Sequence, residues 1–227
     1  VKVIQIEGQD QLFYPRMDIN VALIRGTYAD EWGNVVLSKE VAPLDATAIA
    51  QAVRNSGGTV IVQVEKIVKG GVLDPKLVKV PGVYVDYIVE TAESKYCEQS
   101  FDCEYDAALT GEVTVPLQAL DAVPLNAKKV IARRASLLLL DLSSEAVINL
   151  GIGIPEFVAS VANEEEIGDS LTMTVEAGPI GGVPQGGVRF GASVNAEAIL
   201  DQSSQFDFYD GGGIDLAILG LAEADEK

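Results

Sequence analysis

The sequence contains no histidine, and this absence narrows the chemistry that the chain can perform. Without histidine, Ser-His-Asp and Cys-His catalysis are excluded from these 227 residues, and the commonest metal-binding side chain is missing. Any catalysis within the segment must use carboxylates, backbone amides, Lys, Arg, Tyr or a hydroxyl group. We therefore expect no metal site.

Cysteine is scarce as well. The two cysteines, Cys97 and Cys103, lie six residues apart in a polar stretch. Their spacing does not match a CxxC pair, so neither a metal motif nor a redox motif is expected. Two free thiols in a cytoplasmic protein are the favoured interpretation, and a disulfide is the alternative.

Long apolar runs and positive charges are also rare. The longest apolar patch, Leu137–Leu140, is far shorter than the roughly 20 residues of a membrane helix. The first residues lack the basic and apolar segments of a signal peptide, and because the chain starts at Val1 rather than Met we expect further sequence upstream. The net charge of −18 disfavours nucleic acid and anionic membranes as partners, but it does not exclude a small anion at a local site.

What is present is typical of a soluble globular protein, with 48% hydrophobic and 22% charged residues. Short segments rich in Val and Ile alternate with helical stretches, which predicts an α/β fold with a mostly parallel sheet. Several of the predicted strands are continuously apolar, so we expect them to be buried on both faces. The predicted strands are Val21–Ile24, Val35–Leu37, Thr59–Gln63, Tyr84–Ile88, Val147–Leu150, Leu171–Val175 and Leu216–Leu219. The predicted helices are Asp45–Asn55, Ala127–Leu140, Pro155–Asn163 and Asn195–Asp201.

A change of composition near Asp121–Asn126 indicates a domain boundary, because an acidic, turn-rich region precedes it and a basic helix follows. An internal repeat supports two related domains. Ile19–Trp32 aligns without a gap to Ile214–Lys227, with five of fourteen positions identical. Chance similarity between two strand-turn units is the alternative. We predict that residues 1–125 hold the later part of one domain and residues 126–227 the earlier part of its sister, each incomplete in this chain.

The densest functional signal surrounds Glu176. This residue directly follows a predicted strand, and six glycines lie in the fourteen residues from Gly178 to Gly191. Ligands of open α/β sheets bind beyond the carboxyl ends of the strands. Glycines allow a large ligand to approach the backbone, and their amides can face a developing negative charge. We infer a site centred on Glu176, with a flexible turn and an incidental surface glutamate as the alternative.

Two further glycine clusters are open to two interpretations. Gly211–Gly213 precede a predicted strand and suit either a turn with positive φ or a backbone anion pocket. Asn149–Glu156 combines a strand, a GxG turn and a helix start, similar to a dinucleotide fingerprint. The third glycine of that fingerprint is replaced by Glu156, whose charge would repel a phosphate, so NAD binding is not expected.

The positive charges near these motifs have a functional and a neutral interpretation. The predicted basic helix is suited to meet phosphates through Lys128, Lys129, Arg133 and Arg134, but a solvated helix face is favoured. Arg189, within the glycine-rich loop, is the better-placed cation.

At these motifs the sequence resembles the family I CoA-transferases, above all the single-chain propionate and acetate CoA-transferases, and more distantly succinyl-CoA:3-ketoacid CoA-transferase. The resemblance covers essentially the whole chain, and its motifs follow the order of the family. The segments that carry it are Ala22–Asn34, Pro124–Ala135, Asn149–Glu156, Val175–Gly187 and Arg189–Asp225.

The resemblance implies two related α/β domains and a ping-pong transfer of coenzyme A between a short-chain acyl-CoA and a carboxylate such as acetate or propionate. It assigns Glu176 as the nucleophile that carries CoA as a thioester. Coenzyme A is then a substrate, no cofactor is needed, and a cytoplasmic homo-oligomer is expected. The glycines expected to contact an oxyanion or CoA are Gly151, Gly178, Gly211 and Gly212, with Gly212 as the preferred oxyanion donor.

The chain departs from the family in length, because it is about half as long as a typical member. The resemblance places a second glycine-rich oxyanion loop upstream of this sequence. Two alternatives therefore accompany the transferase prediction: an acyl-CoA hydrolase that uses the same glutamate, and a fragment that keeps the fold but cannot turn over.

Overall fold

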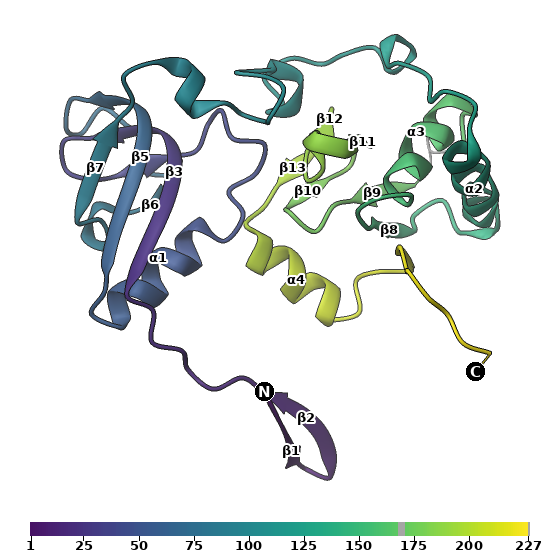
Figure 1. Cartoon of the computed structure of the whole chain (residues 1–227), viewed down its shortest axis with the longest axis horizontal. Helices are drawn as coiled ribbons and strands as arrows, with labels where there is room; N and C mark the ends of the chain where they lie inside the picture. Colours follow the sequence, from purple (N-terminus) through teal and green to yellow (C-terminus); the bar gives the residue numbers. More distant parts are fainter. Residues whose placement is uncertain (168–170, 227) are drawn as a thin grey trace.

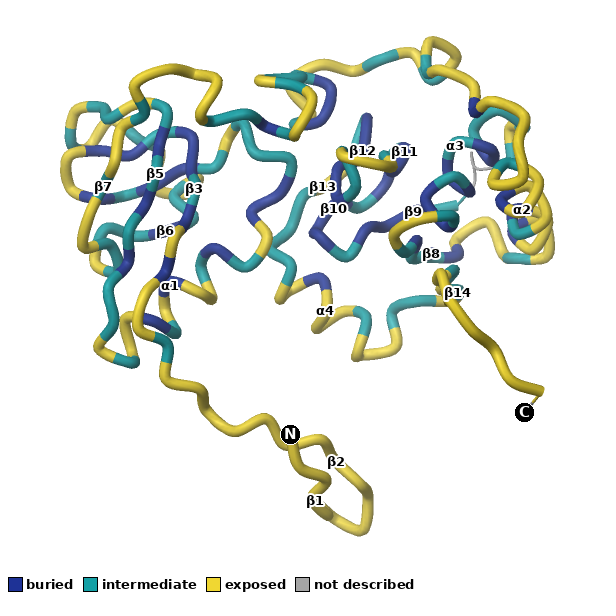
Figure 2. Tube along the Cα trace, viewed as in Figure 1, coloured by how far each residue is buried: buried dark blue, intermediate teal, exposed yellow. Residues whose placement is uncertain are grey.

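The computed structural model describes residues 1–167 and 171–226. Two lobes lie side by side, each built on a five-stranded sheet, and a small hairpin extends from the N-terminus (Figure 1). The hairpin pairs β1 (Lys2–Ile6) with β2 (Gln9–Phe13) through a turn at Glu7 and Gly8, which both have positive φ. Every residue of both strands is exposed, so the hairpin adds nothing to either core (Figure 2).

The first lobe is organised around β3 (Val21–Asp30) and β5 (Thr59–Val68), which run parallel. Helix α1 (Ala46–Asn55) covers one face of this sheet, because Ala46, Ala50 and Val53 recur at helical spacing and are all buried. The other strands of the sheet are β4 (Val35–Val36), β6 (Val78–Val80) and β7 (Tyr87–Glu90), in the order β6-β4-β3-β5-β7.

The second lobe has three parallel strands at the centre of its organisation: β8 (Val147–Leu150), β9 (Thr172–Thr174) and β14 (Leu216–Ile218). Helices α2 (Ala127–Ser136) and α3 (Glu156–Glu164) pack on one face and share a core with the sheet. Two antiparallel strands, β10 (Pro179–Ile180) and β13 (Ala198–Ile199), complete the order β13-β10-β9-β8-β14. A separate two-stranded ladder pairs β11 (Val183–Pro184) with β12 (Ser193–Val194), and α4 (Gln202–Asp210) precedes β14.

The two sheets share one pattern of strand pairing. In each, three neighbouring strands run parallel, and two further strands each pair antiparallel with the strand before them. This confirms the predicted α/β class with mostly parallel sheets. The two copies of the sequence repeat take different places, because β3 is central in its sheet and β14 lies at an edge. Lys227, the last residue of the second copy, lies outside the described residues.

Residues 91–126, here called the strap, connect the lobes and contact both. Gln99 is buried in the strap, where its side chain donates to the Lys39 carbonyl at 2.6 Å and accepts from the Asp106 amide at 2.9 Å. At its far end, Val115 exchanges two hydrogen bonds with the Asn195 side chain of the second lobe. The predicted boundary at 121–126 lies at the end of the strap and stays a prediction. The strap contains the short 3-10 turns η2 (Ser94–Cys97), η3 (Ala107–Leu109) and η4 (Leu117–Ala119).

Some predicted elements are wrong in detail. Asn195–Asp201 is not a helix, because its backbone bonds to the neighbouring strand: Glu197 N donates to Ile180 O, and Leu200 N donates to Gly178 O. The helix begins instead at Gln202. The strand predicted at Tyr84–Ile88 starts at Tyr87, after the 3-10 turn η1 (Gly82–Tyr84).

Three smaller differences concern burial and helix ends. The helix predicted to reach Leu140 is α-helical to Ser136 and continues as the 3-10 turn η5 (Leu137–Asp141). The helix predicted from Asp45 begins at Ala46, and Asp45 takes the N-cap position without a capping hydrogen bond to its side chain. Burial along β3 and β5 alternates rather than being continuous, because among the described residues helix α1 packs on one face of that sheet.

Candidate functional site

Glu176 lies at the carboxyl end of β9, inside the tight turn that reverses the chain into β10. The turn is closed by hydrogen bonds from Gly178 N to Val175 O at 3.0 Å and from Val175 N to Pro179 O at 3.1 Å. Gly178 has φ of 129°, and a Cβ there would lie 2.0 Å from the Leu200 carbonyl oxygen, so the turn requires glycine. The glutamate itself is partly exposed.

The residues on either side of Glu176 anchor the turn in a small apolar cluster. Val175 and Ala177 are buried against Ala42 of the first lobe, and Phe190 and Ile199 pack at the edge of the same cluster. The backbone on both sides of Glu176 is therefore held by contacts from both lobes.

Neighbouring parallel strands bring further predicted residues to the same edge of the sheet. Asn149 of β8 pairs with Thr174 of β9, so Gly151 and Glu176 each lie two residues beyond this pair. The Gly151 amide donates to Ile218 O at the end of β14 at 2.9 Å. Glu176 and Gly151 therefore meet at the carboxyl ends of the strands, where open α/β sheets bind ligands.

The predicted glycine triplet ends helix α4. Gly211 N donates to Asp207 O at 3.1 Å, Gly212 N to Tyr209 O at 3.0 Å, and Gly213 N to Phe208 O at 3.0 Å. Gly212 has φ of 90°, as helix-terminating glycines commonly do. In this arrangement the amides of Gly151, Gly178, Gly211 and Gly212 each donate to a backbone carbonyl, so the proposed oxyanion contact at Gly212 would share a hydrogen already in use.

From the sequence, the charge of Glu156 was expected to repel a nucleotide phosphate. In the structure its side chain binds backbone amides. It is buried at the start of α3, where its carboxylate accepts from the Gly153 amide at 3.2 Å and from the Gly187 amide at 3.0 Å. The carboxylate joins the turn after β8 to the glycine-rich loop. It occupies the position at which a nucleotide phosphate would meet the helix.

A polar network on the α4 side of the sheet was not predicted from the sequence. The Tyr209 hydroxyl contacts Thr174 Oγ1 at 2.7 Å and Asn149 Oδ1 at 3.3 Å, and Gln205 donates to it at 2.8 Å. Burial raises the pKa of Tyr209; the hydrogen bonds to Thr174 and Gln205 oppose this, and the charge of nearby Glu176 adds to it. The alternation of side chains in β8 and β9 is the signal that points to Asn149 and Thr174.

Four of the five predicted cations, all except Arg134, have a partner within the described part of the chain. Arg189 bonds Asp102 at 3.0 Å and Asp106 at 3.1 Å, which fastens the glycine-rich loop to the strap. On α2, Lys129 bonds Glu164 at 2.5 Å and Arg133 bonds Glu165 at 2.7 Å, while Lys128 lies over the Phe157 ring. These partners favour a structural role over a phosphate site.

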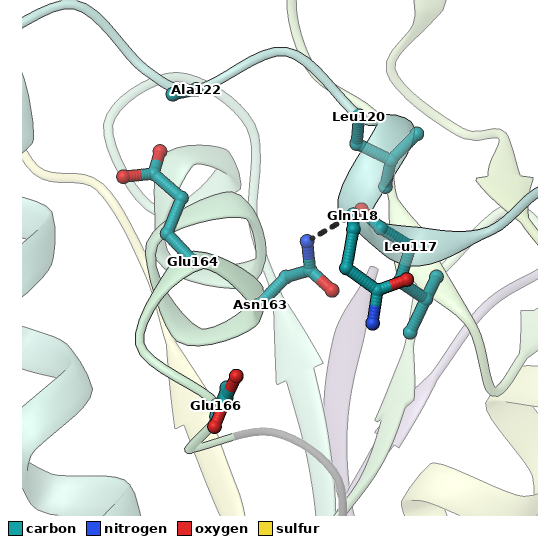
Figure 3. Close-up of a pocket in the computed structure, with 7 residues that line it drawn as sticks. All are labelled: Leu117, Gln118, Leu120, Ala122, Asn163, Glu164 and Glu166. Carbon is teal, nitrogen blue, oxygen red and sulfur yellow. Dashed lines mark hydrogen bonds between the residues drawn. The ribbon is translucent and has the colours of Figure 1, made fainter.

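Two adjoining cavities lie beside the Glu176 turn, of about 440 and 410 Å³. They share Arg25, Val41, Leu44 and Gln99, and Phe190 and Ala42, which pack on the turn, line one cavity each. A third cavity of about 530 Å³ lies between the strap and the end of α3, away from the turn (Figure 3). Its polar lining includes Glu164, Glu166 and Asn163, whose amide donates to the Leu117 carbonyl (Figure 3).

Over residues 1–167 and 171–226, none of the helices combines the length and apolar character needed to cross a bilayer. Cys97 and Cys103 are both free thiols and half-buried, as the sequence predicts.

In sequence and in fold, the chain is similar to coenzyme A transferases. Residues 1–91 match the family model described as Coenzyme A transferase. The caffeate CoA-transferase of Acetobacterium woodii is 46% identical over 226 residues, which cover 100% of this chain and 43% of that protein. The acetate CoA-transferase YdiF of Escherichia coli K12 is 40% identical, again over 100% of this chain and 42% of that protein.

Solved structures agree. The acyl-CoA transferase YdiF of E. coli O157:H7, in a thioester complex with CoA, superposes with a TM-score of 0.85 at 39% identity, over 99% of this chain and 40% of that one. A more distant relative is the succinyl-CoA:3-ketoacid coenzyme A transferase of Xanthomonas campestris, one of whose subunits is 34% identical over 88 residues. The chain spans less than half the length of the relatives that it matches from end to end.

Proposed function

We propose that the protein transfers coenzyme A from an acyl-CoA to a carboxylic acid, and that Glu176 carries CoA as a covalent thioester during the reaction. The observation that carries the proposal is the position of this partly exposed carboxylate, on a glycine-dependent turn at the carboxyl edge of a parallel sheet. Relatives that are 40% and 46% identical over the whole chain are CoA-transferases for acetate and caffeate.

The proposed first half-reaction consists of two substitutions. A carboxylate oxygen of Glu176 attacks the thioester carbonyl carbon, the C–S bond breaks, and CoA leaves as a thiolate. The thiolate then attacks the side-chain carbonyl carbon of Glu176 in the mixed anhydride. The C–O bond breaks, the donor acid leaves as a carboxylate, and a glutamyl-CoA thioester remains.

The second half-reaction reverses these steps with a new carboxylate. No proton is consumed and acyl activation is conserved, so neither ATP nor a histidine base is required. Each step passes through a tetrahedral oxyanion, for which one backbone donor is commonly worth about 3–4 kcal/mol. The Gly212 amide is still our predicted hydrogen-bond donor to this oxyanion. It would have to share its hydrogen between Tyr209 O and the oxyanion.

This chemistry requires that the Glu176 side chain stays in one place. Its carboxylate first attacks the thioester carbonyl carbon, and its own carbonyl carbon is then attacked by the thiolate. Buried Val175 and Ala177 fix the backbone on both sides of Glu176. Substrate binding in the adjoining cavities would place the acyl group beside Leu44 and Phe190. Acetate, propionate and caffeate are the acceptors to compare.

An exchange assay tests the proposal. The full chain is incubated with acetyl-CoA and propionate, and acyl-CoA species are followed by chromatography, together with Glu176→Gln and the control Glu145→Gln. Glu145 is an exposed carboxylate just before β8, at the opposite end of the sheet. Propionyl-CoA formation by the wild type and the control, with loss in Glu176→Gln, supports the proposal.

Other outcomes redirect it. Release of acetate without propionyl-CoA would indicate hydrolysis by the same glutamate. Full activity in Glu176→Gln would contradict the assignment of the nucleophile. Assembly into a homo-oligomer also stays a proposal, which sedimentation of the same sample tests.

A further inference from the structure

Helix α4 docks on the sheet through polar side chains rather than apolar ones. Its one buried residue is Gln205, while Phe206 and Phe208 are 39% and 43% exposed. Tyr209 follows Gln205 by four residues, so the two side chains lie on the same face of the helix. Hydrogen bonds, which are directional, therefore set the position of this helix more than apolar packing does.

The hydrogen bonds form a chain with one direction. Gln205 Nε2 donates to the Tyr209 hydroxyl at 2.8 Å, Tyr209 donates to Thr174 Oγ1 at 2.7 Å, and Thr174 donates to Ile148 O at 2.9 Å. Because the single Thr174 hydroxyl proton is used on Ile148, its oxygen accepts from Tyr209. Asn149 Oδ1, at 3.3 Å, is a weaker second acceptor for the same Tyr209 proton.

These hydrogen bonds include Thr174, which ends the strand that leads to the proposed nucleophile. Thr174 is the last residue of β9 and lies two residues before Glu176, so a hydrogen bond at Thr174 acts close to the turn. Thr174 and Asn149 are also register partners, so Tyr209 contacts β9 at its last residue and β8 one residue before its end. The effect of the Glu176 charge on the Tyr209 pKa agrees with their closeness.

One feature of the network costs stability. Gln205 is fully buried, and within the described part of the chain its Oε1 atom has no hydrogen-bond partner. A buried acceptor without a partner is unfavourable, and an apolar side chain of similar size would avoid this cost. The residue is thus better explained by what its amide orients than by the stability that it adds.

We propose that Tyr209, oriented by Gln205, is a positioning residue for Glu176: its hydroxyl clamps the ends of β8 and β9 and thereby fixes the turn that presents the carboxylate. The proposal rests on the proposed function, because it concerns the geometry of the same nucleophile. Tyr209 acts through Thr174 and does not touch the reacting atoms.

The first test removes one oxygen atom. Tyr209→Phe in the full chain is expected to lower kcat of the exchange reaction by about 10- to 100-fold, with the KM for acyl-CoA nearly unchanged, because a small displacement of a reacting group is costly. The control is Tyr84→Phe, since Tyr84 accepts a comparable bond from Gln51 in the first lobe, at 3.2 Å. Equal kcat in Tyr209→Phe and wild type would overturn the proposal.

The second test separates positioning from general stability. Gln205→Met is expected to keep or raise the thermal midpoint while lowering kcat, because it removes the unpaired acceptor and the orienting donor together. If kcat is unchanged, or if both quantities fall in proportion, the proposal is wrong.

A third measurement does not depend on turnover. Hydrogen exchange at the Val175 and Gly178 amides, which close the Glu176 turn, is expected to be faster in Tyr209→Phe than in wild type and in Tyr84→Phe. Unchanged exchange contradicts the clamp even if the protein transfers no CoA. Faster exchange in a protein that forms no propionyl-CoA would instead retain the clamp and reject the proposed function.

Discussion

At the scale of single residues, the site depends on two nearby positions. The backbone at Gly178 requires a glycine, and the Glu176 side chain carries the charge. Gly178 is forced by a carbonyl oxygen 2.0 Å from where its Cβ would lie. Glu176 next to it is partly exposed, although both of its neighbours in the chain are buried. The position of Glu176 at the junction of a strand and a glycine-rich loop was predictable from the sequence, and its role stays a prediction. The Tyr209 contacts were not predictable, because they depend on how α4 lies against the sheet.

Replacing Gly178 by alanine should disrupt the turn. The added methyl group collides with the Leu200 carbonyl, and φ of 129° is unfavourable for any residue with a Cβ. We expect a loss of about 1–3 kcal/mol in the free energy of unfolding, measured by urea denaturation, and a loss of most exchange activity. Gly187→Ala is the control, because φ there is 64° but nothing lies within 4 Å of the added Cβ. Similar activity in the two variants would contradict the special requirement at position 178.

Neutralising Glu176 should lower the pKa of Tyr209. Burial is the main reason why this pKa is raised above its usual value near 10, and the negative charge of Glu176 raises it further. In Glu176→Gln the burial remains and the charge is removed, so the tyrosine should ionise at lower pH than in wild type. The ¹³Cζ chemical shift of Tyr209, followed through alkaline pH, measures this. A pKa that does not change, or that rises, would show that the carboxylate does not face the hydroxyl.

At the scale of secondary-structure elements, the strands were more predictable than their partners. Continuous Val and Ile segments located β3, β5 and β8, and β8 matches its predicted bounds. The segment before α4 was wrongly predicted to be a helix. Asn195–Asp201 has the composition of a helix, but its Glu197 and Leu200 amides donate to carbonyls of the chain at and next to β10. Short strands such as β11 and β12 carry too few residues for a periodic pattern, and tertiary pairing alone defines them.

The ion pair of Lys129 on α2 with Glu164 on α3 should make a pH-dependent contribution to the free energy of unfolding. Burial raises the pKa of Glu164, but the hydrogen bonds from Lys129 and the Val123 amide and the nearby positive charges outweigh it, so the pKa is lowered from its usual 4.5. A lowered pKa means that this contribution is present above about pH 4.5 and is lost as the pH falls through the folded-state pKa.

The substitution Lys129→Met tests the contribution of this ion pair to stability. It should reduce the free energy of unfolding by about 1–3 kcal/mol at neutral pH, because a charged hydrogen bond in a partly buried site is lost. The difference between variant and wild type should shrink as Glu164 becomes protonated. Urea unfolding at pH 7 and at pH 4 measures both values, and a difference that grows toward low pH would contradict the pairing. Lys128→Met, next in the sequence but set over the Phe157 ring, is the matched control.

At the scale of the whole molecule, two similar sheets are joined by a strap, and the proposed nucleophile lies where the second lobe meets the first. The likeness of the two sheets was expected from the family resemblance, whereas the sequence repeat aligns β3 with β14, which take different places in their sheets. The contacts that unite the lobes were not predictable, because they join residues far apart in sequence, such as Ala42 with Val175 and Ala177, or Arg189 with Asp102 and Asp106. Long-range pairs of this kind leave no local pattern.

The central claim, that Glu176 carries coenzyme A, is tested most directly by trapping the intermediate. The full chain is incubated with acetyl-CoA in the absence of an acceptor acid, treated with borohydride, digested and mapped by mass spectrometry. The account predicts that the peptide containing Glu176 is reduced at that side chain, and that adding acetate before borohydride prevents the change. Reduction at another carboxylate, or adduct formation that persists in Glu176→Gln, would contradict it.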